Sequence, residues 1–291
     1  MDIYTAHFGL TERPFTLVPD PDFLFWSEVH QRAYTMLEYG LMTRAPITLI
    51  TGEIGAGKTT LLQHLLTTLQ EDLTVGLVSN AYGDRGELLR WVLLALDQTP
   101  VPGATYVELF GQLQSYLIDE YAAGRRVILI FDEAQNLGAA NLEELRMLTN
   151  INSGKDELLQ LILVGQPELR QMIARPDLRQ FAQRVSATYH IDPMDLRTTR
   201  DYIRHRLRHV GGTGDEFSPS AMRLIHETSE GVPRIVNKLC DLALVYAASA
   251  GRSAVGLPTV RELIRDELLI RTRTSPLFLT NRVDVTDKAA E

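Results

Sequence analysis

The sequence has very little cysteine and no excess of positive charge. Its 291 residues include one cysteine, Cys240, so no disulfide can form within the chain. Cys240 lies in the amphipathic pattern IVNKLCDLALVYA, where a buried structural thiol is expected. Acidic residues outnumber basic ones, 37 to 29, giving a formal net charge of −8. This balance argues against a surface devoted throughout to nucleic acid, although a local basic patch is compatible with it.

The sequence also lacks long hydrophobic runs. No stretch reaches the roughly 18 uninterrupted apolar residues of a membrane-spanning helix. The most apolar segment, 235–250, is broken by Asn237, Lys238 and Asp241. The N-terminus, MDIYTAHFGL, has no basic region of the kind that begins a secretory signal. We therefore expect a soluble cytoplasmic protein that reaches the inner membrane only peripherally, through a partner.

Residues 1–26 read as an aromatic N-terminal arm. Pro14, Pro19 and Pro21 exclude a long helix there. Several large side chains in the arm need a place to be buried: Phe8, Phe15, Phe23, Phe25 and Trp26. One interpretation is an arm wrapped over the main domain. The other is that the end of the arm forms part of a wall for a nucleotide base.

Residues 27–194 alternate between strand and helix patterns. Ser27 is placed to cap a first helix, 28–43. Predicted strands are 47–51, 74–79, 127–132, 159–165 and 187–191, and predicted helices between them are 57–70, 85–98, 105–123, 139–151 and 167–183. Such alternation predicts an α/β domain with a mostly parallel five-stranded sheet and helices on both faces. The continuous apolar runs at 127–131 and 161–164 suit central strands.

The strand signal stops after Asp195. Segments 195–210, 218–229, 232–250 and 257–270 all have helical patterns, separated by the glycine-containing breaks GGTG and GRSAVGLP. We therefore predict an all-helical second domain over 195–270. The final residues, 271–291, are polar and aperiodic, and we expect a flexible tail.

The segment TGEIGAGKTT contains the pattern G-x-x-x-x-G-K-[ST], with a strand before it and a helix after it. Its glycines allow backbone N–H groups to converge on phosphate oxygens, and the helix N-terminus adds unpaired donors. Lys58 is expected to reach the β- and γ-phosphates, and Thr59 to offer its hydroxyl to Mg²⁺. The sequence thus predicts binding of ATP and Mg²⁺. The predicted nucleotide-binding residues are Gly52, Glu53, Ile54, Gly55, Ala56, Gly57, Lys58, Thr59 and Thr60.

The predicted strand VILIFD ends in a pair of carboxylates, Asp132 and Glu133. Asp132 is expected to hold Mg²⁺ through its water shell. Glu133 is placed to act as the general base that polarises the water attacking the γ-phosphate. A solvated turn is the alternative explanation for such a pair. It is weakened by the five apolar residues before the pair and by the phosphate loop earlier in the chain.

Three further polar residues are candidates for the same site. Gln166 follows a predicted strand, where its side chain could hold the attacking water; a simple turn before Pro167 is the alternative. Arg184 ends a helix just before the last strand, and we predict that it is an arginine finger for a neighbouring subunit. Arg179 competes for that role, and either could be a plain surface arginine. Arg234, in GVPR, could lie over the γ-phosphate or merely begin a helix.

These motifs together resemble an AAA+ ATPase. The segments FGLTERPFTLVPDPDFLF, DEAQNL, LVGQPELR, YIRHRL and GVPRIVNKLCD are similar to the family of general secretion pathway protein A and to related ATPases found with exopolysaccharide and exosortase systems. The resemblance covers roughly residues 6–270. It implies a sheet order of 5-1-4-3-2, a C-terminal helical lid, and ATP hydrolysis at a site shared within a ring or filament of identical subunits. It further implies coupling to a membrane-associated secretion or polysaccharide-export complex.

Two features keep alternatives open. Secretion-pathway members continue into a membrane span and a peptidoglycan-binding part. Because this sequence ends at Glu291 with neither, we expect the short relatives to be the nearer match. Transposition-regulator ATPases share the lid architecture and bind DNA. The arginine-rich segment RTTRDYIRHRLRH fits a phosphate-binding helix. Its apolar stripe, Tyr202, Ile203, Leu207 and Val210, also fits an ordinary amphipathic helix with a charged outer face.

Overall fold

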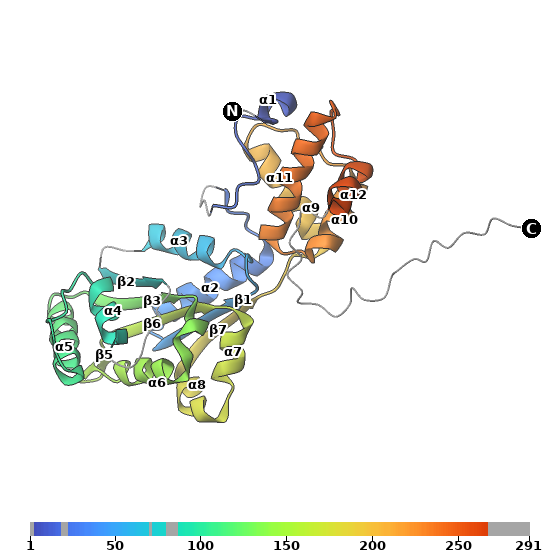
Figure 1. Cartoon of the computed structure of the whole chain (residues 1–291). Helices are drawn as coiled ribbons and strands as arrows, with labels where there is room; N and C mark the ends of the chain where they lie inside the picture. The colour runs from blue at the N-terminus through green and yellow to red at the C-terminus, as the bar shows by residue number, and fades with distance from the viewer. Residues whose placement is uncertain (1–2, 19–22, 70–71, 80–86, 267–291) are drawn as a thin grey trace, which may run out of the picture.

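The fold is described from a computed structural model over residues 3–18, 23–69, 72–79 and 87–266. A five-stranded parallel sheet has the order β2-β3-β6-β1-β7. Numbered along the chain, this is 2-3-4-1-5, the expected order read from the opposite edge. The Asp132 strand is therefore separated from the phosphate-loop strand by β6 (Figure 1). The strands are β1 (Ile47–Gly52), β2 (Leu73–Ser79), β3 (Arg126–Asp132), β6 (Leu159–Gly165) and β7 (Val185–Ile191).

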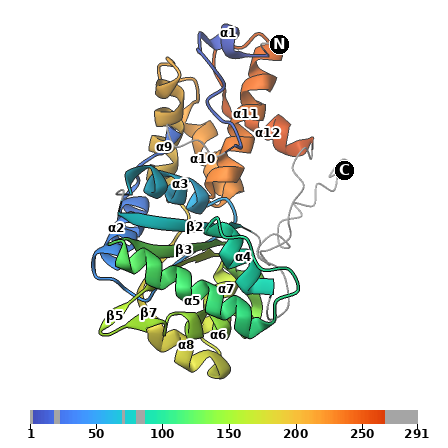
Figure 2. The same ribbon diagram turned by 90° about the vertical axis from the view of Figure 1, so that its left-hand side faces the viewer.

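Helices cover both faces of this sheet, as predicted (Figure 2). Ile128 and Ile130 of β3 pack against α2 (Glu28–Met42) and α3 (Lys58–Thr68). Leu129 and Phe131, which alternate with them, join the core on the opposite face. This period of two explains why the strand reads as a continuous apolar run. The opposite face is covered by α4 (Glu87–Ala95), α5 (Tyr106–Ala122), α6 (Gly138–Leu148), α7 (Pro167–Ile173) and α8 (Arg179–Arg184).

The predicted single helix 167–183 is wrong, because two helices and a 3₁₀ turn, η3 (Pro176–Leu178), occupy this segment. Arg175, with φ −66° and ψ 148°, is extended. A residue before proline is pushed out of the helical region by the proline ring, which ends α7 here. The short hairpin of β4 (Asn152–Ser153) and β5 (Asp156–Glu157) and the 3₁₀ turn η2 (Ala134–Leu137) were not predicted from the sequence.

Between β7 and Asp266, the last described residue, four helices build a separate core: α9 (Leu196–His209), α10 (Pro219–Ser229), α11 (Pro233–Ser249) and α12 (Leu257–Arg265). We call this group the lid. Cys240 is fully buried in it, as predicted. The predicted apolar stripe of α9 is buried as well. The domain boundaries at 26/27 and 194/195 stay predictions, and the predicted tail, 271–291, lies outside the described residues.

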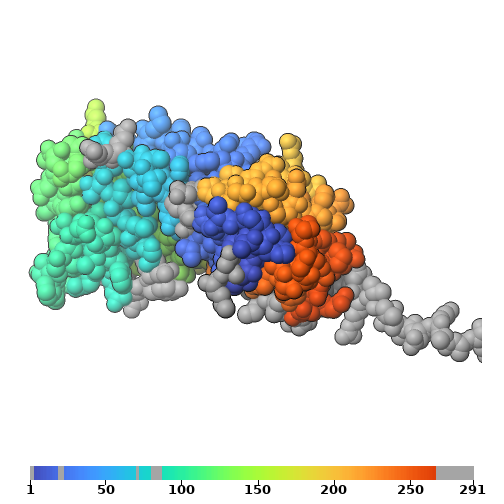
Figure 3. Space-filling model, turned by 90° about the horizontal axis from the view of Figure 1, so that it is seen from above, coloured from blue at the N-terminus to red at the C-terminus, as the bar shows by residue number. Residues whose placement is uncertain are grey.

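Within its described residues, 3–18 and 23–26, the N-terminal arm contains the short helix α1 (Thr5–Phe8). The expectation that the arm covers the α/β domain is wrong, because Tyr4, Phe15 and Phe23 are buried in the core of the lid. Arg206 of α9 fastens it: Nε donates to the Pro14 carbonyl at 2.6 Å, and the guanidinium lies 4.3 Å from the Phe23 ring centroid. Figure 3 shows the dark-blue arm lying against the lid helices. The arm and the lid therefore share one core.

Over the described ranges, none of the helices is both long enough and apolar enough to cross a bilayer.

Candidate functional site

The phosphate loop joins β1 to α3 at the carboxyl edge of the sheet. Gly55 and Gly57 have φ of +81° and +92°, a conformation that favours glycine. Gly57 is the N-cap of α3, so no side chain caps the first turn. The N–H groups of that turn therefore point toward an incoming anion. Glu53 and Ile54 are exposed, whereas Ala56 is buried beneath the loop.

Lys58 is 5% exposed, and its ammonium lies under the loop. Nζ donates to the carbonyls of Gly52 at 2.8 Å and Glu53 at 2.9 Å. Burial lowers the pKa of Lys58, while the nearby carboxylates, Glu133 and Asp132 foremost, oppose that shift. Lys58 thus lies beside the loop with its positive charge close to the acidic end of β3.

Thr59 and Asp132 meet at the point where a metal is expected. Thr59 Oγ1 donates to Asp132 Oδ2 at 3.1 Å, and the Glu133 N–H donates to the other carboxylate oxygen at 2.9 Å. Burial raises the pKa of Asp132, although both hydrogen bonds act in the opposite direction. A hydroxyl and a carboxylate side by side next to a phosphate cradle are the ligands that Mg²⁺ uses with nucleotides. The residues present therefore fit that ion.

Glu133 lies at φ +54°, in the left-handed region that side-chain-bearing residues seldom adopt. Its Oε2 accepts hydrogen bonds from Gln135 Nε2 at 2.6 Å and Gln166 Nε2 at 2.9 Å. Burial favours the neutral acid, but these two bonds and the Lys58 charge outweigh it and lower the pKa of Glu133. The structure thus presents Glu133 as an ionised carboxylate aimed by two amides.

Gln135 is a member of this group that sequence reasoning missed. Its Oε1 accepts from the Gln166 N–H at 3.1 Å, so one side chain holds both Glu133 and the residue after β6. Gln166 is the N-cap residue of α7, at the carboxyl end of its strand. The signal in the sequence that could have identified Gln135 was the motif DEAQ, in which it follows Glu133 by two residues.

Arg234 brings the lid to the phosphate loop. It lies in the first turn of α11, and its N–H donates to the Gly55 carbonyl at 3.2 Å. A Cβ on Gly55 would lie only 2.3 Å from the Cβ of Arg234. The guanidinium-bearing side chain is exposed. The fold therefore places this predicted residue directly against the loop.

His30 is a second contact that sequence reasoning missed. It lies in the first turn of α2 and is 7% exposed. Nε2 lies 2.9 Å from the Ala56 carbonyl, and Nδ1 lies 2.7 Å from the hydroxyl of Ser27. The predicted cap is present, since Ser27 Oγ also accepts the His30 N–H. A lone histidine in a helix carries no motif, so only the tertiary contact could identify it.

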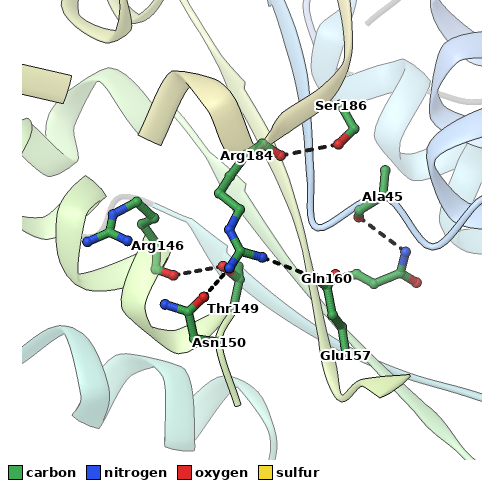
Figure 4. Close-up of polar contacts among 8 residues, drawn as sticks. All are labelled: Ala45, Arg146, Thr149, Asn150, Glu157, Gln160, Arg184 and Ser186. Atoms are coloured by element: carbon green, nitrogen blue, oxygen red, sulfur yellow. Dashed lines mark hydrogen bonds and ion pairs between the residues drawn. The ribbon is translucent and has the colours of Figure 1, made fainter. Parts of the chain in front are cut away.

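Arg184 does not join the others. It precedes β7, whose first residue, Val185, pairs with Ile47 at the amino edge of the sheet. Its guanidinium forms an ion pair with Glu157 at 3.0 Å and donates to Asn150 Oδ1 (Figure 4). Seven residues of β7 separate it from the phosphate edge, roughly 20 Å at about 3.3 Å per residue. Arg179, the competitor, is exposed at the start of α8.

The arginine-rich segment forms α9, and its arginines lie in different environments. Arg206 is buried against the arm, whereas Arg204, Arg208 and Asp201 line a surface cavity of about 480 Å³ with the neighbouring Phe25, His205 and His209. The acidic residue among the basic ones reduces the charge of this surface.

Comparisons with known proteins agree with the geometry. A family model described as an AAA domain matches residues 41–173. General secretion pathway protein A from Aeromonas hydrophila is 39% identical over 252 residues. That alignment covers 86% of this chain and 46% of the relative, so the chain spans about half of that protein's length.

Solved structures with this fold include Cdc6p and the replication initiation protein DnaA. Cdc6p from Pyrobaculum aerophilum aligns with a TM-score of 0.64 and 17% identity, covering 86% of this chain and 71% of that one. Domain III of DnaA from Thermotoga maritima aligns with a TM-score of 0.54 and 20% identity, covering 86% and 98%. At such identities the likeness shows the fold alone, which is the P-loop AAA+ fold.

Proposed function

Because the chain is a P-loop AAA+ protein and a homologue of general secretion pathway protein A, we propose that it binds ATP with Mg²⁺ and hydrolyses it. The observation that carries the proposal is the meeting of three elements at one edge of the sheet. Thr59 of α3 bonds Asp132 of β3, and Gln166 after β6 bonds the adjacent Glu133.

In this proposal the chain's own residues divide the work. The loop N–H groups and Lys58 hold the phosphates, and Thr59 with Asp132 holds Mg²⁺, which neutralises phosphate charge when bound. Glu133, kept ionised by its two amide donors, accepts the proton of the attacking water. Gln166 orients the same water. Arg234 reports the state of the γ-phosphate to the lid.

Replacing Glu133 by glutamine tests the base. The amide keeps the size of the side chain but cannot accept the proton, so ATP binds and hydrolysis falls by about 10²–10⁴-fold. Lys58→Ala is expected to lose ATP binding itself. Glu227→Gln, an exposed carboxylate on α10, serves as the matched control and keeps full activity. Normal hydrolysis by Glu133→Gln would exclude this assignment.

We propose further that the site is completed by a neighbouring copy. Arg184 lies too far along β7 to reach the phosphates of its own chain, which supports a role toward the nucleotide of a second subunit in a ring or filament. Mixing two inactive variants tests this directly. Lys58→Ala with Arg184→Ala restores part of the activity, because some interfaces then pair an intact loop with an intact arginine. Arg179→Ala is the control that distinguishes the two candidates.

We propose a membrane-associated secretion or polysaccharide-export complex as the partner, and the relative's name supports the secretion pathway. The rival is a DNA-bound regulator. Duplex DNA binding measured across salt concentrations separates them: a steep negative slope of log K against log salt supports DNA as the partner. Weak binding without that slope supports the secretion assembly. A pull-down with Glu133→Gln, which is expected to bind ATP without hydrolysing it, then identifies the partner.

A further inference from the structure

The His30 ring contacts two residues of the phosphate loop, Ala56 and Gly57. Besides its 2.9 Å contact with the Ala56 carbonyl, its ring touches the last glycine of the loop: a Cβ built on Gly57 would lie 2.9 Å from Nε2. The ring comes from α2, an element outside the nucleotide motif, and it is held there by the Ser27 hydroxyl. The His30 side chain therefore supports the phosphate loop.

The hydrogen bond has a defined direction. A carbonyl oxygen only accepts, so Nε2 must carry the proton that it shares with Ala56. In the neutral ring Nδ1 is then an acceptor, which the Ser27 hydroxyl satisfies by donating to it. Burial lowers the pKa of His30 and so favours this neutral form. The ring is thus fixed in one tautomer by partners on both nitrogens.

That bond determines where a phosphate-binding N–H points. Ala56 and Gly57 share one peptide plane, and no peptide bond among the described residues is cis. In a trans peptide the C=O and the next N–H point in opposite directions. With the Ala56 carbonyl held toward His30, the Gly57 N–H is directed away from the His30 ring. A freed carbonyl would let this peptide rotate and turn the donor aside.

The segment that carries His30 is also tied to the lid. The arm before α2 is anchored through Arg206, and Asn237 of α11 donates to the Thr16 carbonyl at 3.2 Å. The lid contacts the loop through Arg234, whose N–H donates to the Gly55 carbonyl. The loop is therefore contacted by α2, which follows the arm directly, and by α11 of the lid.

We propose that His30 is a positioning residue that orients the Ala56–Gly57 peptide of the phosphate loop for nucleotide binding. The inference rests on the proposed binding of ATP. It predicts that the Nε2 donor, and not merely a side chain of similar bulk, sets the affinity for nucleotide.

Two variants of the full chain separate these possibilities. The amide nitrogen of His30→Gln reaches the position of Nε2, whereas that of His30→Asn reaches only the position of Nδ1. We expect His30→Asn to bind Mg-ATP about tenfold more weakly in calorimetry, as for loss of one buried hydrogen bond. His30→Gln stays within about threefold of the wild type. Melting temperatures without nucleotide show whether both variants are folded.

The inference fails if His30→Asn binds as tightly as the wild type, or if both variants weaken equally while melting normally. Should either unfold, nuclear magnetic resonance of the wild type labelled with ¹⁵N-histidine decides: an Nε2–H tautomer supports the proposal, and an Nδ1–H tautomer overturns it. A wild type without affinity for Mg-ATP refutes the proposed function instead, whatever tautomer His30 has.

Discussion

Replacing Gly55 by alanine probes the contact through which the lid touches the phosphate loop. At φ +81° an alanine costs about 1–2 kcal/mol in backbone energy. Its Cβ would also lie 2.3 Å from the Cβ of Arg234, an overlap that costs roughly 1–3 kcal/mol by analogy with overpacked cores. We therefore expect the free energy of unfolding to fall by about 2–5 kcal/mol.

Gly103 offers a matched control, because it has φ +72° and no atom within 4 Å of its would-be Cβ. Gly103→Ala should lose only the backbone cost, about 1–2 kcal/mol. Urea unfolding followed by circular dichroism gives both values by linear extrapolation. Adding Arg234→Gly to Gly55→Ala removes the opposing Cβ, so the double-mutant cycle should return a favourable coupling of about 1 kcal/mol or more.

Two results would refute this reasoning. The first is that Gly55→Ala and Gly103→Ala lose the same stability, which would mean that the overlap with the lid costs nothing. The second is a cycle with no coupling between positions 55 and 234. Either would show that the lid does not rest on the loop as the structure has it.

Three further predictions follow from the contacts described. Gln166→Leu removes one donor to Glu133, so the pKa of that carboxyl rises and the acidic limb of the activity–pH profile moves to higher pH; an unmoved limb would contradict the hydrogen bond. Glu157→Gln removes the ion pair that holds Arg184. ATPase activity at low protein concentration should then rise by up to about fivefold, which corresponds to the free energy of a partly exposed ion pair; a fall in ATPase activity would contradict the arginine-finger role of Arg184. Arg206→Ala should release the arm, lowering the free energy of unfolding by about 2–4 kcal/mol and exposing the arm to trypsin; unchanged cleavage would disprove the anchor.

The local elements of the fold could be predicted because their signals lie in consecutive residues. β3 was predicted from its run of apolar residues, and the phosphate loop from its glycines and lysine. The single helix 167–183 was predicted wrongly, because Pro176 interrupts it although the helical pattern of the sequence continues on both sides. The aromatic arm was recognised, but its partner was not, because hydrophobic side chains do not specify which core they enter.

By itself the sequence determined the chemistry available: a loop of backbone donors, a lysine, and two carboxylates at a strand end. Short-range constraints decide such features, since glycine conformations and strand periodicity depend on neighbouring residues. Only the tertiary structure decided which distant groups meet there. His30 reaches Ala56 across 26 residues, and Gln166 reaches Glu133 across 33, through contacts that no local pattern encodes. The same long-range packing places Arg184 at the far edge of the sheet, away from the site in its own chain.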